Sequence, residues 1–162
     1  MRRMVISILV ENVSGVLSRV SGLFSRRGYN IDSLTVSETQ NSKYARMTVA
    51  VTGEEHVLEQ IKNQLNKLED VKDIEELYDN NSVCRELILV KIEAKPSDRP
   101  GIIAIADVFR AKIVDVGTDS VMVELTGNQA KMDAFVKLLD DYNIIELVRT
   151  GVTGLARGTE WL

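Results

Sequence analysis

The sequence has very few of the residues on which most enzyme chemistry depends. It holds one cysteine and one histidine, Cys84 and His56, in 162 residues. A single cysteine excludes an internal disulfide and a thiolate metal cluster built from one chain. With one imidazole, the chain also lacks what catalytic triads, Cys-His pairs and His-rich metal sites require. We interpret His56 as a solvated surface residue and Cys84 as a passive one, and predict no catalytic residue and no metal site.

A basic excess, abundant aromatic residues and long apolar runs are absent as well. The net charge is -4 and aromatic residues make up 5% of the chain, whereas nucleic-acid interfaces normally show a basic face or aromatic stacking platforms. Apolar stretches fall short of the roughly 18 to 20 residues of a membrane-spanning helix, and no signal-peptide core follows Met1. We expect a cytoplasmic protein that binds neither nucleic acid nor a membrane.

One stretch near the start of the chain, Ile8 to Leu34, has a clear internal order. The apolar run from Met4 to Glu11 predicts a buried strand, and residues from about Gly15 to Arg27 show the spacing of a helix with one buried face. Gly28 suits the left-handed position that ends a helix. Because the first amides of a helix lack internal partners and carry its positive dipole end, the loop before this helix suits an anion such as a carboxylate.

The rest of the first half completes a βαββαβ pattern. The predicted strands and helices are strands at residues 4–11, 31–37, 44–51 and 71–77, and helices at about 15–27 and 54–68. This order is that of the split βαβ arrangement, which forms a four-stranded antiparallel sheet with strand order 4-1-3-2 and both helices on one face.

The second half repeats the pattern. Strands are expected at residues 87–94, 112–116, 120–126 and 144–148, with one helix beginning near Pro100 and another capped by Asn128. The sequence therefore predicts an α+β protein of two ferredoxin-like βαββαβ units. We expect a first domain at residues 1–78, a linker at 79–85 and a second domain at 86–162, including a glycine-bearing tail.

Each small unit should leave edge strands with unpaired backbone groups, and association through such an edge is a natural remedy. We expect the edge strand 31–37 to begin at the same end of its sheet as the loop from Asn12 to Gly15. Pairing of this edge with its copy in a second chain would then bring one chain's loop near Asn30 and Ile31 of the other. This geometry is a hypothesis.

The residues from Asn12 to Val36 resemble the small regulatory subunit of acetohydroxyacid synthase, also called acetolactate synthase. Further similarity lies in Arg46-Met47-Thr48, residues 109–116, Asp133-Ala134-Phe135 and residues 149–158, so the resemblance covers nearly the whole chain. The first half looks like the ACT domain of that family, a ferredoxin-like module that binds amino acids.

The resemblance implies a regulatory subunit without an active site of its own. Its partner would be the large catalytic subunit, which uses thiamine diphosphate, Mg and FAD to join pyruvate with a second 2-oxo acid. The small subunit would form a homodimer through its ACT domains, raise the activity of the large subunit and confer feedback inhibition by valine or another branched-chain amino acid.

Carried over by motif, the effector site would combine residues of one chain with residues of its dimer mate: Asn12, Gly15, Val16 and Leu17 on one, Asn30 and Ile31 on the other. The chemistry agrees, because helix-start amides can hold a carboxylate and the aliphatic residues can contact an aliphatic effector. The family's loop often has proline where this chain has Ser14, which we expect to cap the helix through its hydroxyl.

Other interpretations remain open at this point. Without the resemblance, Asn12 and Ser14 would be taken as helix caps, Gly15 and Gly28 as backbone requirements, and Val16, Leu17 and Ile31 as core. A free-standing sensor with two ACT-like units, regulating another enzyme or transcription, fits the pattern too. A small enzyme of the acylphosphatase type would need an arginine in its phosphate-binding loop, and the loop from Asn12 to Leu17 lacks one.

Overall fold

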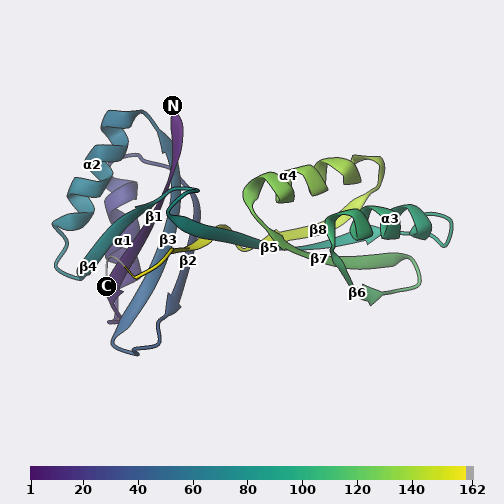
Figure 1. Ribbon diagram of the computed structural model, residues 1–162, viewed down its shortest axis with the longest axis horizontal. Coiled ribbons are helices and arrows are strands. Elements are labelled where there is room, and N and C mark those ends of the chain that lie inside the picture. The colour runs from purple at the N-terminus through teal and green to yellow at the C-terminus, as the bar shows by residue number, and fades with distance from the viewer. Residues whose placement is uncertain (160–162) are drawn as a thin grey trace. The chain divides into compact units, whose positions relative to one another are not determined.

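The computed structural model describes residues 1–159 of the chain. It divides into two compact units, one formed by residues 1–84 together with 152–159 and the other by residues 85–151. Both units are α+β, with helices packed on one face of an antiparallel sheet (Figure 1). The predicted fold class is therefore confirmed. No helix within residues 1–159 is long and apolar enough to cross a membrane.

The first unit has the predicted βαββαβ order. Its elements are β1 (Arg2–Glu11), α1 (Val16–Arg26), β2 (Ile31–Glu38), β3 (Tyr44–Gly53), α2 (Glu55–Asn66) and β4 (Val71–Leu77). The strands lie in the order β2-β3-β1-β4 and pair antiparallel, which confirms the expected topology. The strand β2 forms one edge of this sheet.

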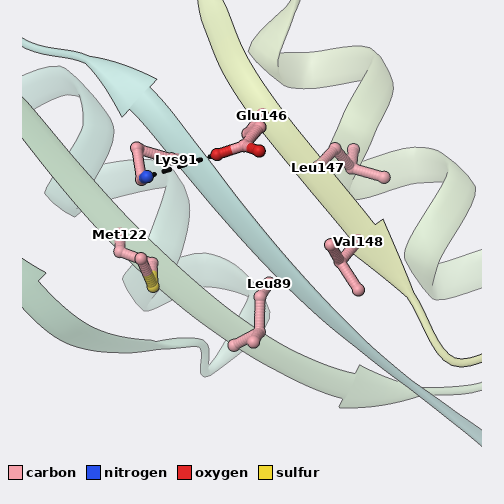
Figure 2. Close-up of a pocket in the computed structure, with 6 residues that line it drawn as sticks. All are labelled: Leu89, Lys91, Met122, Glu146, Leu147 and Val148. Carbon is pink, nitrogen blue, oxygen red and sulfur yellow. Dashed lines mark hydrogen bonds and ion pairs between the residues drawn. The ribbon is translucent and has the colours of Figure 1, made fainter.

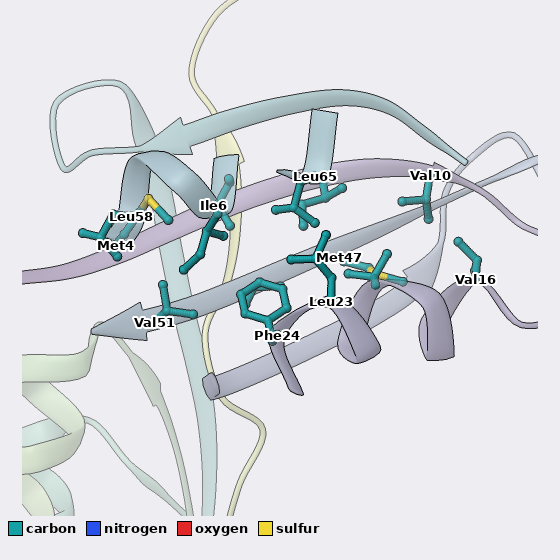
Figure 3. Close-up of a cluster of buried hydrophobic side chains, with 14 of the residues drawn as sticks. Met4, Ile6, Val10, Val16, Leu23, Phe24, Met47, Val51, Leu58 and Leu65 are labelled. Carbon is teal, nitrogen blue, oxygen red and sulfur yellow. The ribbon is translucent and has the colours of Figure 1, made fainter. Parts of the chain in front are cut away.

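The period-two pattern of β1 determines which face of the sheet is buried. Alternate residues of β1 point toward the helices, where they pack with one face of α1 and one face of α2 (Figure 3). The largest fully buried side chains of this core are Phe24, Met4, Ile6, Ile8, Met47, Leu58, Ile61 and Leu65. At about 1.5 to 3 kcal/mol for each large apolar side chain removed from water, this cluster is the main stabilising contribution to the unit.

The second unit repeats the topology. Its elements are β5 (Ser82–Glu93), α3 (Arg99–Phe109), β6 (Lys112–Val116), β7 (Ser120–Gly127), α4 (Gln129–Leu138), the 3-10 turn Leu139–Asp141 and β8 (Ile144–Arg149). The strand order is β6-β7-β5-β8, and the core is a separate apolar cluster. The predicted cap is confirmed, because Asn128 Oδ1 accepts a hydrogen bond of 2.9 Å from the Lys131 amide.

The segment expected to be a linker, residues 79–85, is mostly strand. Asn81 closes a turn by accepting a 2.7 Å hydrogen bond from the Tyr78 amide and donating one of 3.2 Å to the Glu76 carbonyl. From Ser82 onward the chain is β5. The alternation that predicts a strand begins only near Leu87. The earlier residues of β5 form a strand because they pair with residues far away in the sequence.

That pairing comes from the tail, which returns to the first unit. After Gly151 the chain forms the short strand β9 (Thr153–Ala156), which pairs with β5. The Gly154 amide donates a 3.4 Å hydrogen bond to Thr48 Oγ1, on the sheet face opposite the helices. We call residues 152–157 the strap. From the sequence these residues are expected in the second domain, because a strand of four residues has no periodicity that would show where it pairs.

Candidate functional site

The loop between β1 and α1 is built around Gly15. This residue precedes the first residue of the helix, Val16, with φ 83° and ψ -2°, a left-handed conformation in which a side chain is costly. No side chain caps the first turn. The expectation that the Ser14 hydroxyl caps α1 is therefore wrong. The N-cap position is occupied by Gly15, and Ser14 lies one residue before it.

At the start of α1 the backbone is close to solvent, whereas the side chain of Val16 is not. The Val16 amide donates a 3.3 Å hydrogen bond to the Val13 carbonyl, and the first bond of the helix runs from the Arg19 amide to the Gly15 carbonyl. The Val16 side chain is buried in the core, whereas that of Leu17 is 43% exposed. Of the two predicted aliphatic contacts on this loop, only Leu17 is therefore available to a ligand in solvent.

Asn12 fastens the loop to the neighbouring hairpin. Its Nδ2 donates a 3.0 Å hydrogen bond to the Ser42 carbonyl, and its backbone amide donates one of 2.8 Å to the Lys43 carbonyl. The Oδ1 atom of a side-chain amide accepts rather than donates hydrogen bonds. Asn12 therefore has a structural contact and offers a ligand an acceptor.

Arg19, in the first turns of α1, lies beside this loop and is not predicted from the sequence. A Cβ atom added to Gly15 would lie 2.9 Å from Arg19 Nη1, and Nη2 donates a 3.4 Å hydrogen bond to the Ser14 carbonyl. Long helical side chains lean toward the helix N-terminus, so a residue four positions after the glycine lies over it. An arginine four residues after the glycine is the sequence feature from which this position could have been predicted. Arg19 also forms an ion pair with Asp70.

A second ion pair lies at the same end of the sheet, where β1 ends. Lys72 Nζ lies 3.0 Å from Glu11 Oε1, and both side chains are about two-fifths exposed. The hydrogen bond with Glu11 raises the pKa of Lys72. Lys72 is thus held in its charged form beside the loop, and its charge is compensated by a carboxylate.

The other predicted site residues, Asn30 and Ile31, lie at the opposite end of the sheet. Strand β1 ends with Glu11 opposite Tyr44, whereas β2 begins with Ile31 opposite Val51. Tyr44 and Val51 are seven positions apart on β3, about 24 Å at roughly 3.4 Å per residue. The expectation that β2 begins at the same end as the loop is wrong, because β2 and β1 both run antiparallel to β3 and so point the same way.

One chain therefore brings Asn12, Gly15, Val16 and Leu17 together and leaves Asn30 and Ile31 far from them. Asn30 is exposed and Ile31 half-buried. Within a single chain the six predicted residues do not form one site.

The second unit carries a shallow apolar hollow on its sheet (Figure 2). It is lined by Leu89, Lys91, Met122, Glu146, Leu147 and Val148. The main polar feature is an ion pair of 3.3 Å between Lys91 Nζ and Glu146 Oε2. Residues 1–159 include no cluster of three or more His, Cys, Asp or Glu side chains placed to hold a metal ion.

Comparison with protein families gives a match to each half of the chain. Residues 6–73 match a family described as AHAS small subunit-like ACT domain. Residues 85–158 match one described as small subunit of acetolactate synthase. Together the two matches span both units and the strap.

Individual proteins match over nearly the full length. A protein of Escherichia coli named acetolactate synthase isozyme 3 small subunit is 47% identical over 157 residues, 96% of each chain. One of Archaeoglobus fulgidus, named probable acetolactate synthase small subunit, is 46% identical over 96% of this chain and 97% of its own. A crystal structure of the acetolactate synthase small subunit from Thermotoga maritima superposes with a TM-score of 0.89 at 35% identity, covering 98% of this chain and 99% of that one.

Proposed function

The chain belongs to the acetolactate synthase small-subunit family, and we propose that it activates a large catalytic subunit and makes it sensitive to valine or another branched-chain amino acid. The observation that carries this proposal is similarity along the whole chain, at close to half identity, to proteins with that name. The resemblance inferred from the sequence is confirmed. Activation and feedback inhibition are the parts that experiments must test.

The effector site is proposed to form between two copies of the chain. If the edge strand β2 pairs antiparallel with its copy across a two-fold axis, the start of one β2 lies beside the end of the other. The end of β2 pairs with Ala45, next to the Tyr44 that lies opposite Glu11. Asn30 and Ile31 of one chain would thereby approach the other chain's loop, so their distance within one chain is compatible with a shared site.

The chemistry of such a site suits a free amino acid. The amides that begin α1, other than that of Val16, which donates to the Val13 carbonyl, would hold the carboxylate, with the helix dipole favouring its negative charge. Asn12 Oδ1 and Asn30 Oδ1 would accept hydrogen bonds from the ammonium group. Leu17 would contact the aliphatic side chain together with Ile31 of the second copy.

Valine can regulate activity only if it prefers one arrangement of the paired units over another. A coupling free energy of about 1 to 3 kcal/mol, a change of roughly 5- to 150-fold in a population or affinity, is typical. In this proposal the large subunit holds thiamine diphosphate, Mg and FAD and performs the chemistry. The present chain contributes binding and a change of conformation.

The decisive experiment is reconstitution with the large subunit from the same organism. The purified pair is titrated with valine, leucine and isoleucine while acetolactate formation is followed, and co-elution on a sizing column reports the complex. We expect activity above that of the large subunit alone and inhibition by at least one of the three. No complex and no activation would point to a free-standing sensor instead.

A further inference from the structure

The strap is bonded directly to the edge strand β2. Thr35 Oγ1 donates a 3.1 Å hydrogen bond to the Val152 carbonyl, and the Val152 amide lies 3.4 Å from Ser33 Oγ, to which it donates. Ser33 and Thr35 point to the face of the sheet opposite the helices, because they pair with Ala50 and Thr48 rather than with the core residue Val49. The backbone carbonyl and the backbone amide of Val152 are thus both bonded to side chains of β2.

The strap fits this face closely. Val152 is only 3% exposed, and a Cβ atom at Gly154 would lie 2.6 Å from Leu77 Cδ1 and 2.8 Å from Cys84 Sγ. Only glycine allows so close an approach without a shift of neighbouring atoms. Beyond it, the Arg157 amide donates a 2.7 Å hydrogen bond to the Asn81 carbonyl. The strap is therefore fixed at both of its ends.

Two hydroxyl residues are buried on this face of the sheet, and one of them is bonded to the strap. Thr48 is 1% exposed and Ser7 is 3% exposed. Thr48 Oγ1 accepts from the Gly154 amide, and Ser7 Oγ accepts a 2.6 Å hydrogen bond from Arg46 Nη1. Burying a hydroxyl without a partner is unfavourable, so this polar sheet face suits a covering backbone that supplies donors.

The contact with β2 lies where that strand is irregular. The register of β2 against β3 shifts between Ile31 and Ser33, which marks a β-bulge. A bulge re-aims the residues beside it and bends the strand. Ser33, which the strap contacts, directly follows the bulge, and Asn30 and Ile31 precede it. A displacement of Ser33 and Thr35 therefore changes the direction in which Asn30 and Ile31 project.

We propose that the strap is a positioning element for the effector site: by holding Ser33 and Thr35 it sets the path of β2 and so the placement of Asn30 and Ile31. This inference rests on the proposed function, since it assigns regulation to that same site. The strap follows β8 directly in the chain, so it ties the residues after Arg149 to the strand that carries half of the site. Valine affinity depends on it although no strap residue touches valine.

The test uses the full chain reconstituted with its large subunit. Thr35→Val removes the hydroxyl that donates to Val152 and keeps the branched shape, whereas Thr35→Ser keeps the hydroxyl. We expect Thr35→Val to raise the valine concentration for half-inhibition by about two- to tenfold, the range of one lost hydrogen bond. Thr35→Ser restores the parent value. Activation of the large subunit by either variant stays at the parent level.

Hydrogen exchange supplies a readout of the contact itself. In Thr35→Val, amides of β2 around Ser33 to Val36 exchange faster than in the parent, and those of β7 do not. Thr126→Val is the matched control, because Thr126 is an exposed strand residue of the second unit, and it should change neither measurement. Gly154→Val, which forces the strap away from Leu77, should raise the half-inhibition concentration at least as much as Thr35→Val.

The outcomes separate this inference from the proposed function. A parent protein that shows no response to any branched-chain amino acid overturns the proposed function, and the inference with it. A parent that responds normally while Thr35→Val and Gly154→Val respond just like it overturns the strap alone. Faster exchange in β2 with an unchanged half-inhibition concentration also overturns it, because the strap would then stabilise the fold without positioning the site.

Discussion

Gly15 is the residue on which the proposed carboxylate site can be tested most directly. Replacing it by aspartate puts a fixed carboxylate at the start of α1, beside Arg19, where the effector carboxylate would lie. We expect Gly15→Asp to activate the large subunit and to lose valine inhibition. Calorimetry on the isolated chain should show that valine binding falls below detection.

Gly15→Asn is the matched control, because asparagine has nearly the same shape, tolerates the left-handed conformation equally well and carries no charge. It should retain a larger share of valine sensitivity than the aspartate variant. Equal loss in both would show that space or backbone strain at Gly15, rather than charge, explains the effect.

Glu76 gives a prediction about pH. Its side chain is 7% exposed and lies 2.9 Å from Arg2 Nη1 and 3.2 Å from Lys62 Nζ. Burial alone would raise the pKa of Glu76, but hydrogen bonds from Arg2, Tyr78 and Lys62 outweigh it and lower the pKa. A lowered folded-state pKa means that the stabilisation is present above the unfolded pKa, about 4.3, and is lost as pH falls through the folded value.

We therefore expect Glu76→Gln to reduce the free energy of unfolding by about 1 to 3 kcal/mol at pH 7. The difference from the parent should begin to shrink as pH falls below about 4.3, because Glu76 of the unfolded parent is then protonated while the folded carboxylate keeps its charge down to its lowered pKa. Urea unfolding at pH 7 and pH 3.5 measures both. Glu59→Gln is the control, since Glu59 also pairs with Lys62 but is 53% exposed, and it should change stability far less.

At the residue scale, the sequence predicts features that depend only on neighbouring residues, such as a glycine at the end of a helix. The place of Gly28 at the end of a helix predicts a left-handed conformation, and its φ is positive, whereas the positive φ of Gly15 is not predicted. The bond from Asn12 to the Ser42 carbonyl and the position of Arg19 over Gly15 were not predicted. Both depend on which side chains the fold brings close, and residue type alone does not give that.

Helix α1 offers a prediction at the scale of a single element. Gly22 lies within Val16–Arg26 in ordinary helical backbone, and a Cβ atom there would have Arg26 Nη1 at 3.6 Å as its neighbour. We expect Gly22→Ala to stabilise the first unit by about 0.5 to 1 kcal/mol, because alanine loses less backbone entropy on folding. Thermal unfolding should show a rise of a few degrees.

The same substitution at Gly15 provides the contrast, since φ there is 83° and alanine is disfavoured in that conformation. Gly15→Ala should lower the unfolding temperature. A lower temperature for Gly22→Ala would mean that α1 requires the flexibility of glycine at its centre.

Elements with a long hydrophobic pattern were predicted with small errors at their ends. The helices α1 and α2 and the strands β1, β3 and β4 have apolar periods that a single core explains. By contrast, β9 and the first residues of β5 were missed. They are strands because they pair with each other, and a pairing between residues so far apart in sequence leaves no local pattern.

At the scale of the whole molecule, the proposed pairing of β2 with its copy can be broken with one charge. Val36 lies on β2 and is 45% exposed. In Val36→Lys the two copies of the new ammonium group would lie close together across the two-fold axis, and burying like charges is unfavourable. We expect a lighter sedimenting species and a parallel loss of valine inhibition.

Val108→Lys makes the same chemical change on α3, where Val108 is 78% exposed, and should alter neither property. If Val36→Lys stays as large as the parent and remains sensitive to valine, the edge of β2 is not where two copies meet.

One topological expectation that is wrong concerns this edge. The βαββαβ pattern predicts the strand order, but the start of β2 is expected from the sequence at the same end of the sheet as the loop at Gly15. The register shows the two at opposite ends of the sheet. Direction within a sheet follows from counting antiparallel pairings, and the proposed antiparallel pairing with a second copy would make that separation compatible with one shared site.

The strap also sets an order in which the protein can be completed during its synthesis. Thr35 Oγ1 bonds to the carbonyl of Val152, 117 residues later in the chain. When β1 to β4 have emerged from the ribosome, the apolar core of the first unit can form, but its polar sheet face is still uncovered. The residues of the entire second unit must emerge before that face is closed, and contacts of such sequence separation form slowly. An edge strand held by the strap therefore acquires its final path only late in synthesis, after the second unit has emerged.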